Sequence, residues 1–154
     1  MDPFGIQLRQ PLAGDLIGQK VAIAAIGTAF EATYVWRIRV PQDVIAEGSF
    51  QAGETGTLEA FCHEVAVTTD FVGPATFELA GDDPSGQTTG LDVQSVAIIV
   101  IGGTRGFVVH QVVGGDTLSA LARRFGSTVN NIAVANRLPN PDLIRVGQIL
   151  RIPV

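Results

Sequence analysis

The chain has 154 residues, of which 46% are hydrophobic and 16% are charged, and its formal net charge is −5. This composition excludes a disordered chain and allows either one domain or two small ones. The only cysteine, Cys62, excludes an intramolecular disulfide, so burial and backbone pairing must hold the fold together.

Charge is divided unevenly along the chain. Residues 1–106 carry five basic and thirteen acidic side chains, whereas residues 107–154 carry five arginines and two aspartates. Because nucleic-acid binding needs a concentrated basic surface, we expect no nucleic-acid partner. The apolar runs are shorter than the roughly 20 residues of a spanning helix, so we expect no membrane span. We also expect the export signal or anchor to be absent from this chain.

Apolar segments separated by turn residues fill the first two thirds of the chain. Their short, regular spacing predicts an antiparallel β-sandwich of about seven strands. Tyr34, Trp36 and Ile38 lie on one face of a strand at period two, which predicts Trp36 as a core residue. The predicted strands lie at 5–11, 19–27, 31–40, 44–52, 56–69, 73–81 and 91–101.

The opening strands carry a family resemblance. The stretch "IQLRQPLAGDLIGQKVAIAAIGTAFEATYVWRIRV" contains a P-x-A-G-D turn and a G-x-A-F-E-A join, and "VIAEGSFQAG" follows it. Over about residues 5–101 this order resembles the immunoglobulin-like domain of bacterial spore-germination proteins. The resemblance implies a β-sandwich in a wall-associated or sporulation-linked protein, and it supplies no ligand.

Candidate metal ligands in this half of the chain are few. Asp82 and Asp83, with Asp92, lack the regular spacing of a calcium loop, and "DDPSG" at 82–86 predicts a tight turn. His63 and His110 fall in predicted strands without a ligand-spaced partner. We therefore predict no metal and no cofactor.

Catalytic motifs are also missing from the sequence. It contains no Gly-x-Ser-x-Gly elbow, no phosphate-binding loop and no paired zinc-binding histidines. Cys62 and His63 are adjacent in a predicted strand, so their side chains point to opposite faces. We expect no catalytic residues and no enzyme activity.

A glycine-rich segment, "GGTRG" at 102–106, predicts a linker between two domains. The predicted domains are an immunoglobulin-like β-sandwich at 1–101 and a smaller domain at 107–154. Five extended residues span at most about 17 Å, so the two domains must be near neighbours.

The terminal domain begins with a β-branched strand in "GFVVHQVV" and continues into a helix capped by Asp116 or Thr117. The helix has apolar residues at three- and four-residue spacing, and a glycine, Gly126, ends it. Thr128 predicts the cap of a second helix at 129–135, after which Asn136 adopts the left-handed conformation. A loop with two prolines precedes the strand "QILRIPV", so the expected order is β-α-α-β.

The spaced elements V-x-G-G-D-T-L-S-x-L-A-R-R-F-G, S-T-V-x-x-I-x-x-A-N and L-x-N-P-D-L-I-x-V-G-Q-x-L-R-I-P closely resemble the LysM domain. This resemblance implies binding of N-acetylglucosamine-containing glycan, such as peptidoglycan or chitin, in a shallow groove between two loops. Carried over by position, one wall is Gly115, Asp116, Thr117 and Leu118, and the other is Asn140, Pro141, Leu143 and Ile144.

Each wall residue also has a structural explanation. A turn accounts for Gly115, a helix cap accounts for Asp116, and Leu118 is expected to point into the core. Pro141, Leu143 and Ile144 lie in a loop, where apolar side chains have less structural reason to occur. Neither wall contains an aromatic residue for sugar stacking, which predicts weak binding by a single module.

The sequence therefore predicts an all-β immunoglobulin-like sandwich followed by a small α+β (βααβ) LysM module, in a non-catalytic protein of the cell wall or spore envelope, outside the cell. The terminal module binds glycan, while the sandwich acts as a spacer or as a surface for a protein partner. The alternative is a structural or scaffold protein of a spore or cell-envelope assembly with little glycan binding.

Overall fold

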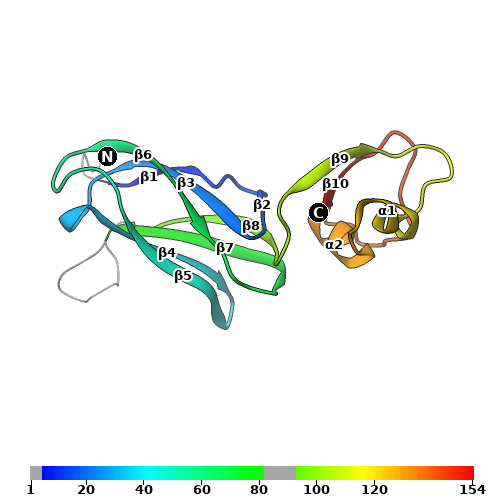
Figure 1. Ribbon diagram of the computed structural model, residues 1–154, viewed down its shortest axis with the longest axis horizontal. Coiled ribbons are helices and arrows are strands. Elements are labelled where there is room, and N and C mark those ends of the chain that lie inside the picture. The colour runs from blue at the N-terminus through cyan, green and yellow to red at the C-terminus, as the bar shows by residue number, and fades with distance from the viewer. Residues whose placement is uncertain (1–4, 82–92) are drawn as a thin grey trace.

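We describe the chain from a computed structural model, in which residues 5–81 and 93–154 are described. Asp82, Asp83 and Asp92, together with the predicted turn at 82–86, lie outside the described residues. A larger body of β-strands is followed by a smaller body of strands and helices (Figure 1). This arrangement confirms the predicted fold class.

The larger body is a sandwich of two β-sheets. One sheet has three strands in the order β1-β3-β6, and the other has five in the order β2-β8-β7-β4-β5. All the neighbouring strands in these sheets are antiparallel except β2 and β8. The strands are β1 (Gln7–Gln10), β2 (Leu16–Ile17), β3 (Lys20–Gly27), β4 (Thr33–Val40), β5 (Asp43–Gln51), β6 (Glu59–Ala66), β7 (Val72–Gly81) and β8 (Gln94–Ile101), and a short 3₁₀ turn, η1 (Phe30–Ala32), precedes β4.

The sandwich core follows the alternation seen in the sequence. On β4, Tyr34, Trp36 and Ile38 are buried between the two sheets. The intervening Arg37 and Arg39 form ion pairs with glutamates of β5 and β7. Full burial of one large apolar side chain contributes about 1.5–3 kcal/mol, so this face of β4 is a main source of stability. The prediction that Trp36 belongs to the core is confirmed.

One strand of the sandwich was not predicted. In β2, Leu16 pairs with Ile99 and Ile17 pairs with Val100, both in parallel register. A two-residue strand is too short to show an alternating pattern, so periodicity cannot predict it. The expected all-antiparallel sandwich therefore contains one parallel pair, and this pair lies at the end of the sandwich nearest the terminal domain (Figure 1).

The smaller body has the predicted β-α-α-β order. Its elements are β9 (Phe107–Gln111), α1 (Leu118–Phe125), α2 (Val129–Ala135) and β10 (Ile149–Pro153). The two strands form an antiparallel pair. Leu121 of α1, Ile132 of α2 and Leu150 of β10 are fully buried and form the centre of a separate core.

The ends of the two helices follow the predicted capping, with one exception. Gly126 ends α1 in the left-handed conformation at φ 68°, and the Thr128 hydroxyl caps α2 by accepting a hydrogen bond from the Asn131 amide at 3.0 Å. The prediction of a left-handed Asn136 is wrong, because its φ is −106°. The following residue, Arg137, takes the left-handed conformation instead, at φ 52°.

The Asn136 side chain forms three hydrogen bonds that link α2 to β10. Its Nδ2 donates to the carbonyl oxygens of Ile132 at 2.8 Å and of Arg151 at 2.7 Å, and its Oδ1 accepts from the Arg151 amide at 2.8 Å. One side chain therefore satisfies the last turn of α2 and the outer edge of β10 together.

The segment between the two bodies lies closely against the sandwich. The Gln19 amide donates to the Thr104 carbonyl at 2.7 Å, and the Gln19 side chain donates to the Gly103 carbonyl at 3.0 Å. Gly102 packs so tightly on the Thr69 carbonyl that a Cβ atom would not fit there. Residues 102–106, although rich in glycine, are thus held by specific contacts.

The two bodies also contact each other directly. Ile99 and Ile101 at the end of β8 form a small buried cluster with Ala135 of α2. The Arg151 guanidinium donates to the Gly14 carbonyl of the sandwich at 2.9 Å and to the Ala135 carbonyl at 2.6 Å. Apolar burial and charge-assisted hydrogen bonds therefore fix the terminal domain against the end of the sandwich.

Candidate functional site

The first predicted wall lies in the loop between β9 and α1. The Asp116 carboxylate closes this loop, because its Oδ2 accepts from the Val113 amide at 3.0 Å and from His110 Nε2 at 2.8 Å. Gly115 has φ 91°, and nothing lies within 4 Å of the position a Cβ would take. The loop therefore has a fixed shape and leaves an open backbone surface at Gly115.

The structure settles which residue caps α1. The Thr117 hydroxyl accepts a hydrogen bond from the Ala120 amide at 3.1 Å, so Thr117 is the N-cap. Asp116 does not cap the helix, because its carboxylate turns back to the strand side of the loop. Helix capping therefore does not account for Asp116.

The environment of Asp116 favours the ionised carboxylate. The hydrogen bond from the Val113 amide lowers the pKa of Asp116 below its usual value, and the hydrogen bond from His110 adds to this effect. Arg124 on α1 contributes a weaker attraction in the same direction. Asp116 thus holds a negative charge at the base of the loop.

His110 is a residue whose local role was not predicted. It lies on β9 and donates to Asp116, six residues further along the chain. In the sequence, His110 and Asp116 lie on either side of Gly114 and Gly115, and this spacing could have predicted their contact across the turn. His110 therefore holds the loop that contains the first predicted wall.

The second predicted wall lies in the loop between α2 and β10. The Asn140 side chain accepts from the Asp142 amide at 2.9 Å, and the Asn140 carbonyl accepts from the Leu143 amide at 3.2 Å. These bonds form a compact turn that exposes Pro141 and leaves the Leu143 side chain 70% exposed. Ile144 differs, because it is partly buried against the terminal core.

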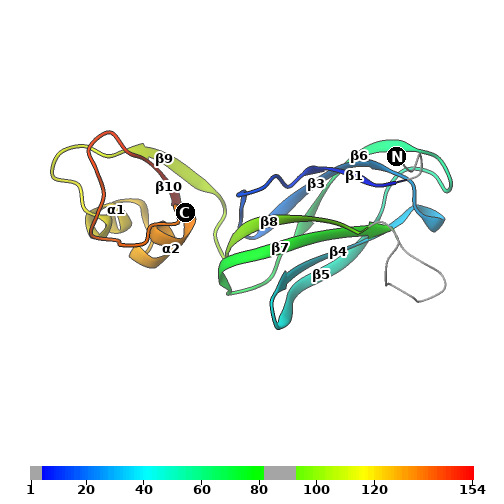
Figure 2. The same ribbon diagram turned by 180° about the vertical axis from the view of Figure 1, so that it is seen from behind.

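Backbone pairing joins the bases of the two loops. The Val112 amide donates to the Gln148 carbonyl at 2.8 Å, and the Gly147 amide donates to the Val112 carbonyl at 2.8 Å. Leu118, which is 3% exposed, belongs to the core beneath the first loop, as expected. Both loops lie at the end of the terminal domain farthest from the sandwich, as Figure 1 and the reverse view in Figure 2 show.

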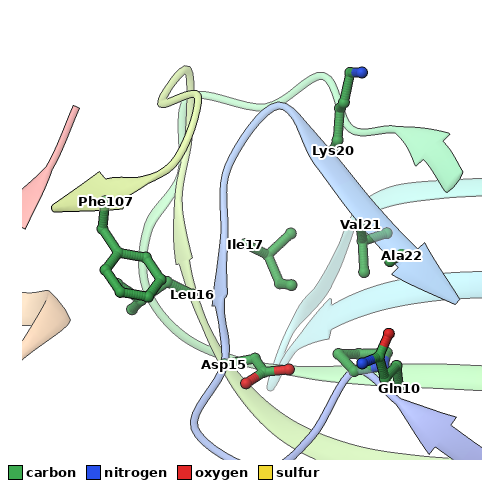
Figure 3. A pocket seen from close by; sticks show the side chains of 9 residues that line it. Gln10, Asp15, Leu16, Ile17, Lys20, Val21, Ala22 and Phe107 are labelled. Carbon is green, nitrogen blue, oxygen red and sulfur yellow. The ribbon is translucent and has the colours of Figure 1, made fainter. Parts of the chain in front are cut away.

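Three cavities among the described residues lie elsewhere, near the junction of the two bodies. One of them, of about 290 Å³, lies between the start of β9 and the sandwich, where Phe107 and Leu16 both contribute to its lining (Figure 3). Within residues 5–81 and 93–154, no group of three or more His, Cys, Asp or Glu side chains is arranged to hold a metal ion. Among the described helices, none combines the length and apolar character needed to cross a membrane.

Comparison with known protein families identifies both parts of the chain. Residues 5–88 match the immunoglobulin-like domain of bacterial spore germination, and residues 110–153 match the LysM domain. The chain belongs to the first family over more than half of its length, and its terminal domain is a LysM domain. The second assignment places this domain in a family of glycan-binding modules.

Individual relatives match the chain over limited regions. The secreted LysM effector ECP6 of Passalora fulva is 38% identical over 88 residues, which is 57% of this chain and 32% of the relative. The secreted LysM effector slp2 of Pyricularia oryzae is 53% identical over 51 residues, 32% of this chain and 18% of the relative. The cortical fragment-lytic enzyme of Bacillus subtilis is 46% identical over 46 residues, 30% of this chain and 11% of the relative. The chain thus spans no more than a third of the length of any of these three relatives.

Proposed function

We propose that the terminal domain binds N-acetylglucosamine-containing glycan, of the peptidoglycan or chitin type, between the loops at 115–118 and 140–144. The observation that carries this proposal is the shape of these loops. Each is fixed by its own hydrogen bonds, and together they present open backbone and exposed apolar groups at the free end of the domain. Loops that are ordered before binding lose less entropy when a ligand arrives.

The chemistry of the two loops suits an acetylated aminosugar. Such a sugar offers an amide, several hydroxyl groups and a methyl group, which need backbone polar groups and small apolar contacts. Gly115 and Asn140 supply accessible backbone, while Pro141 and Leu143 supply exposed apolar surface. Asp116 and Thr117 complete the first wall.

Two of the predicted wall residues have supporting roles in this proposal. Leu118 and Ile144 pack on the terminal core, below the first and second loops respectively. They position the loops, whereas the other wall residues contact the sugar directly. Because no aromatic side chain is present in either wall, one module binds weakly, and firm attachment depends on a repetitive glycan.

The sandwich serves in this proposal as a spacer or as a surface for a protein partner. Arg151 and Ala135 of the terminal domain contact the sandwich, where Ile99 packs against Ala135. These contacts support a fixed spacing between the sandwich and the glycan site, because they leave the two loops facing away from the sandwich. The chain has no catalytic activity of its own in this account. Its location is outside the cell, at a cell wall or spore envelope, in keeping with secreted effectors and a cortical fragment-lytic enzyme among its relatives.

A pelleting assay with insoluble peptidoglycan and with chitin tests the proposal. The variant Leu143→Ser removes an apolar side chain of the second loop that is 70% exposed, at little cost to the core. Loss of about 1 kcal/mol of apolar contact weakens binding about fivefold. Leu58→Ser is the matched control, since Leu58 is 51% exposed on a loop of the sandwich and should bind as the unmodified chain does.

The alternative is a scaffold protein of a spore or cell-envelope assembly with little glycan binding. It gains support if the unmodified chain fails to pellet with either polymer. Release of soluble fragments from peptidoglycan would contradict the non-catalytic part of the proposal.

A further inference from the structure

The strand β9 has one edge that is paired with β10 and one that is open. Gly106 and Val154 exchange two backbone hydrogen bonds, and the Val112 amide donates to Gln148 at the other end of the ribbon. Hydrogen-bonded pairs alternate along an antiparallel ladder, so Val108 and His110 direct their backbone groups toward β10. Phe107, Val109 and Gln111 direct theirs away from it.

These outward backbone groups have no partner among residues 5–81 and 93–154. The outer edge of β10 is different, because Asn136 of α2 bonds to both backbone groups of Arg151 and because Pro153 has no amide hydrogen. One edge of the two-stranded ribbon is therefore covered, and the other is open.

The composition of β9 also sets it apart from the other edge strands. Natural sheets protect their edges with charged residues, proline or very short strands. Among the described edge strands, β5 and β6 each carry two acidic residues, β1 carries Arg9, and β2 has only two residues. The strand β9, with the sequence FVVHQ, has no proline, lysine, arginine or acidic residue, and its Val109 side chain is 66% exposed.

We propose that this edge pairs with the same edge of a second copy of the chain, in antiparallel register about a two-fold axis at Val109. Val109 then faces Val109 of the second copy, and Phe107 faces Gln111 of the second copy. All three outward residues find partners in this register, which gives roughly six backbone hydrogen bonds between the two chains.

Charge favours a second copy as the occupant. Residues 1–106 of each chain have an excess of acidic side chains, and residues 107–154 have an excess of arginine. Antiparallel pairing of β9 directs the sandwich of each copy toward the far end of the other copy's ribbon. The two β9 strands at the centre of the pair carry no acidic residue, lysine or arginine, so no like charges face each other there.

A cavity lies beside the start of β9. Phe107 turns its ring toward Leu16 of the sandwich (Figure 3), and the cavity of about 290 Å³ at this position is not filled by the described side chains. A dimer also places two terminal domains in one particle, which would strengthen attachment to a repetitive glycan if the proposed function holds.

Sedimentation velocity of the full chain over a concentration series, without glycan, tests the pairing. We expect a reversible monomer–dimer equilibrium. The variant Val109→Lys places two ammonium groups together at the axis and should weaken dimerisation about tenfold or more. Leu58→Lys, with the same charge change on an exposed loop of the sandwich, should leave the equilibrium unchanged.

Amide hydrogen exchange of the unmodified chain locates the contact without a variant. The amides of Val109 and Gln111 should exchange more slowly as the concentration rises, while those of Val108 and His110 stay equally protected at every concentration. A chain that sediments as a monomer throughout the series would overturn the proposal, and the edge would then be open to some other extended segment. A dimer that Val109→Lys leaves intact, or that does not protect the Val109 amide, would also overturn it.

Discussion

Asn136 links the second helix to the last strand, so its replacement by aspartate should strongly destabilise the terminal domain. Asn136→Asp keeps an acceptor for the Arg151 amide but removes both hydrogen bonds donated by Nδ2. Each lost bond costs about 1 kcal/mol, and the two carbonyl oxygens then face a carboxylate, which adds about 1 kcal/mol or more. We expect a total loss of about 3 kcal/mol in the free energy of unfolding of this domain.

Two spectroscopic signals separate the two domains in this experiment. The described α-helices, α1 and α2, lie in the terminal domain, so circular dichroism at the helical band follows its unfolding. The only tryptophan, Trp36, is buried in the sandwich, and its fluorescence follows that domain. In a domain this small a loss of 3 kcal/mol lowers the melting temperature by at least about 12–24 °C. The helical transition should move by this amount, and the Trp36 transition should move much less.

The matched control is Asn130→Asp on the same helix. Asn130 is exposed in the first turn of α2, where a negative charge is neutral or slightly favourable. Equal helical transitions for Asn136→Asp and Asn130→Asp would refute the role given to the Asn136 side chain.

Further predictions concern Asp116 and Arg151. The pKa of Asp116 is lower in the folded protein than its ordinary value. The ionised carboxylate therefore stabilises the fold when the pH is above the ordinary pKa, and this stabilisation is lost as the pH falls through the folded-state pKa. In acid titrations followed by circular dichroism, Asp116→Asn should therefore lose less stability than the unmodified chain, and parallel curves would contradict this. Arg151→Met removes the donor to the sandwich carbonyl at Gly14 and should lower the stability of the terminal domain by about 1–2 kcal/mol in urea titrations. Arg123→Met, on the exposed face of α1, should change this stability by less than about 0.5 kcal/mol. Similar losses for both variants would argue against a role of Arg151 in fixing the terminal domain to the sandwich.

Periodic patterns account for most of the fold that could be predicted. The alternation around Trp36 and the threonine and glycine caps of the two helices are local signals, and each is confirmed. The strand β2 gave no signal, because two residues contain no period and its pairing with β8 is distant in the sequence.

Side-chain tasks were harder to predict than backbone elements. Asparagine is a residue type that often ends a helix in the left-handed conformation. The side-chain amide of Asn136 instead forms hydrogen bonds that join α2 to β10, and Arg137 adopts the left-handed conformation. Asp116 has the residue type of a helix cap, yet it pairs with His110 across the Gly-Gly turn. In both cases the deciding partner is brought close only by the tertiary fold.

The residues of the candidate site were predicted from their positions in the family motif. Gly115, Asn140, Pro141 and Leu143 lie exposed on two ordered loops, but the sequence could not show that Ile144 turns partly into the core. Contact between the domains was equally hidden, because Arg151 and Gly14 are distant in the chain.

Titration of the full chain with N-acetylglucosamine oligomers, followed by amide chemical shifts, tests glycan binding most directly. Glycan binding between the two loops predicts saturable shifts at Gly115, Asp116 and Thr117 in the first loop and at Asn140 and Leu143 in the second, with the amides of the sandwich unchanged. An absence of shifts in both loops at saturating oligomer, or shifts confined to the sandwich, would contradict it.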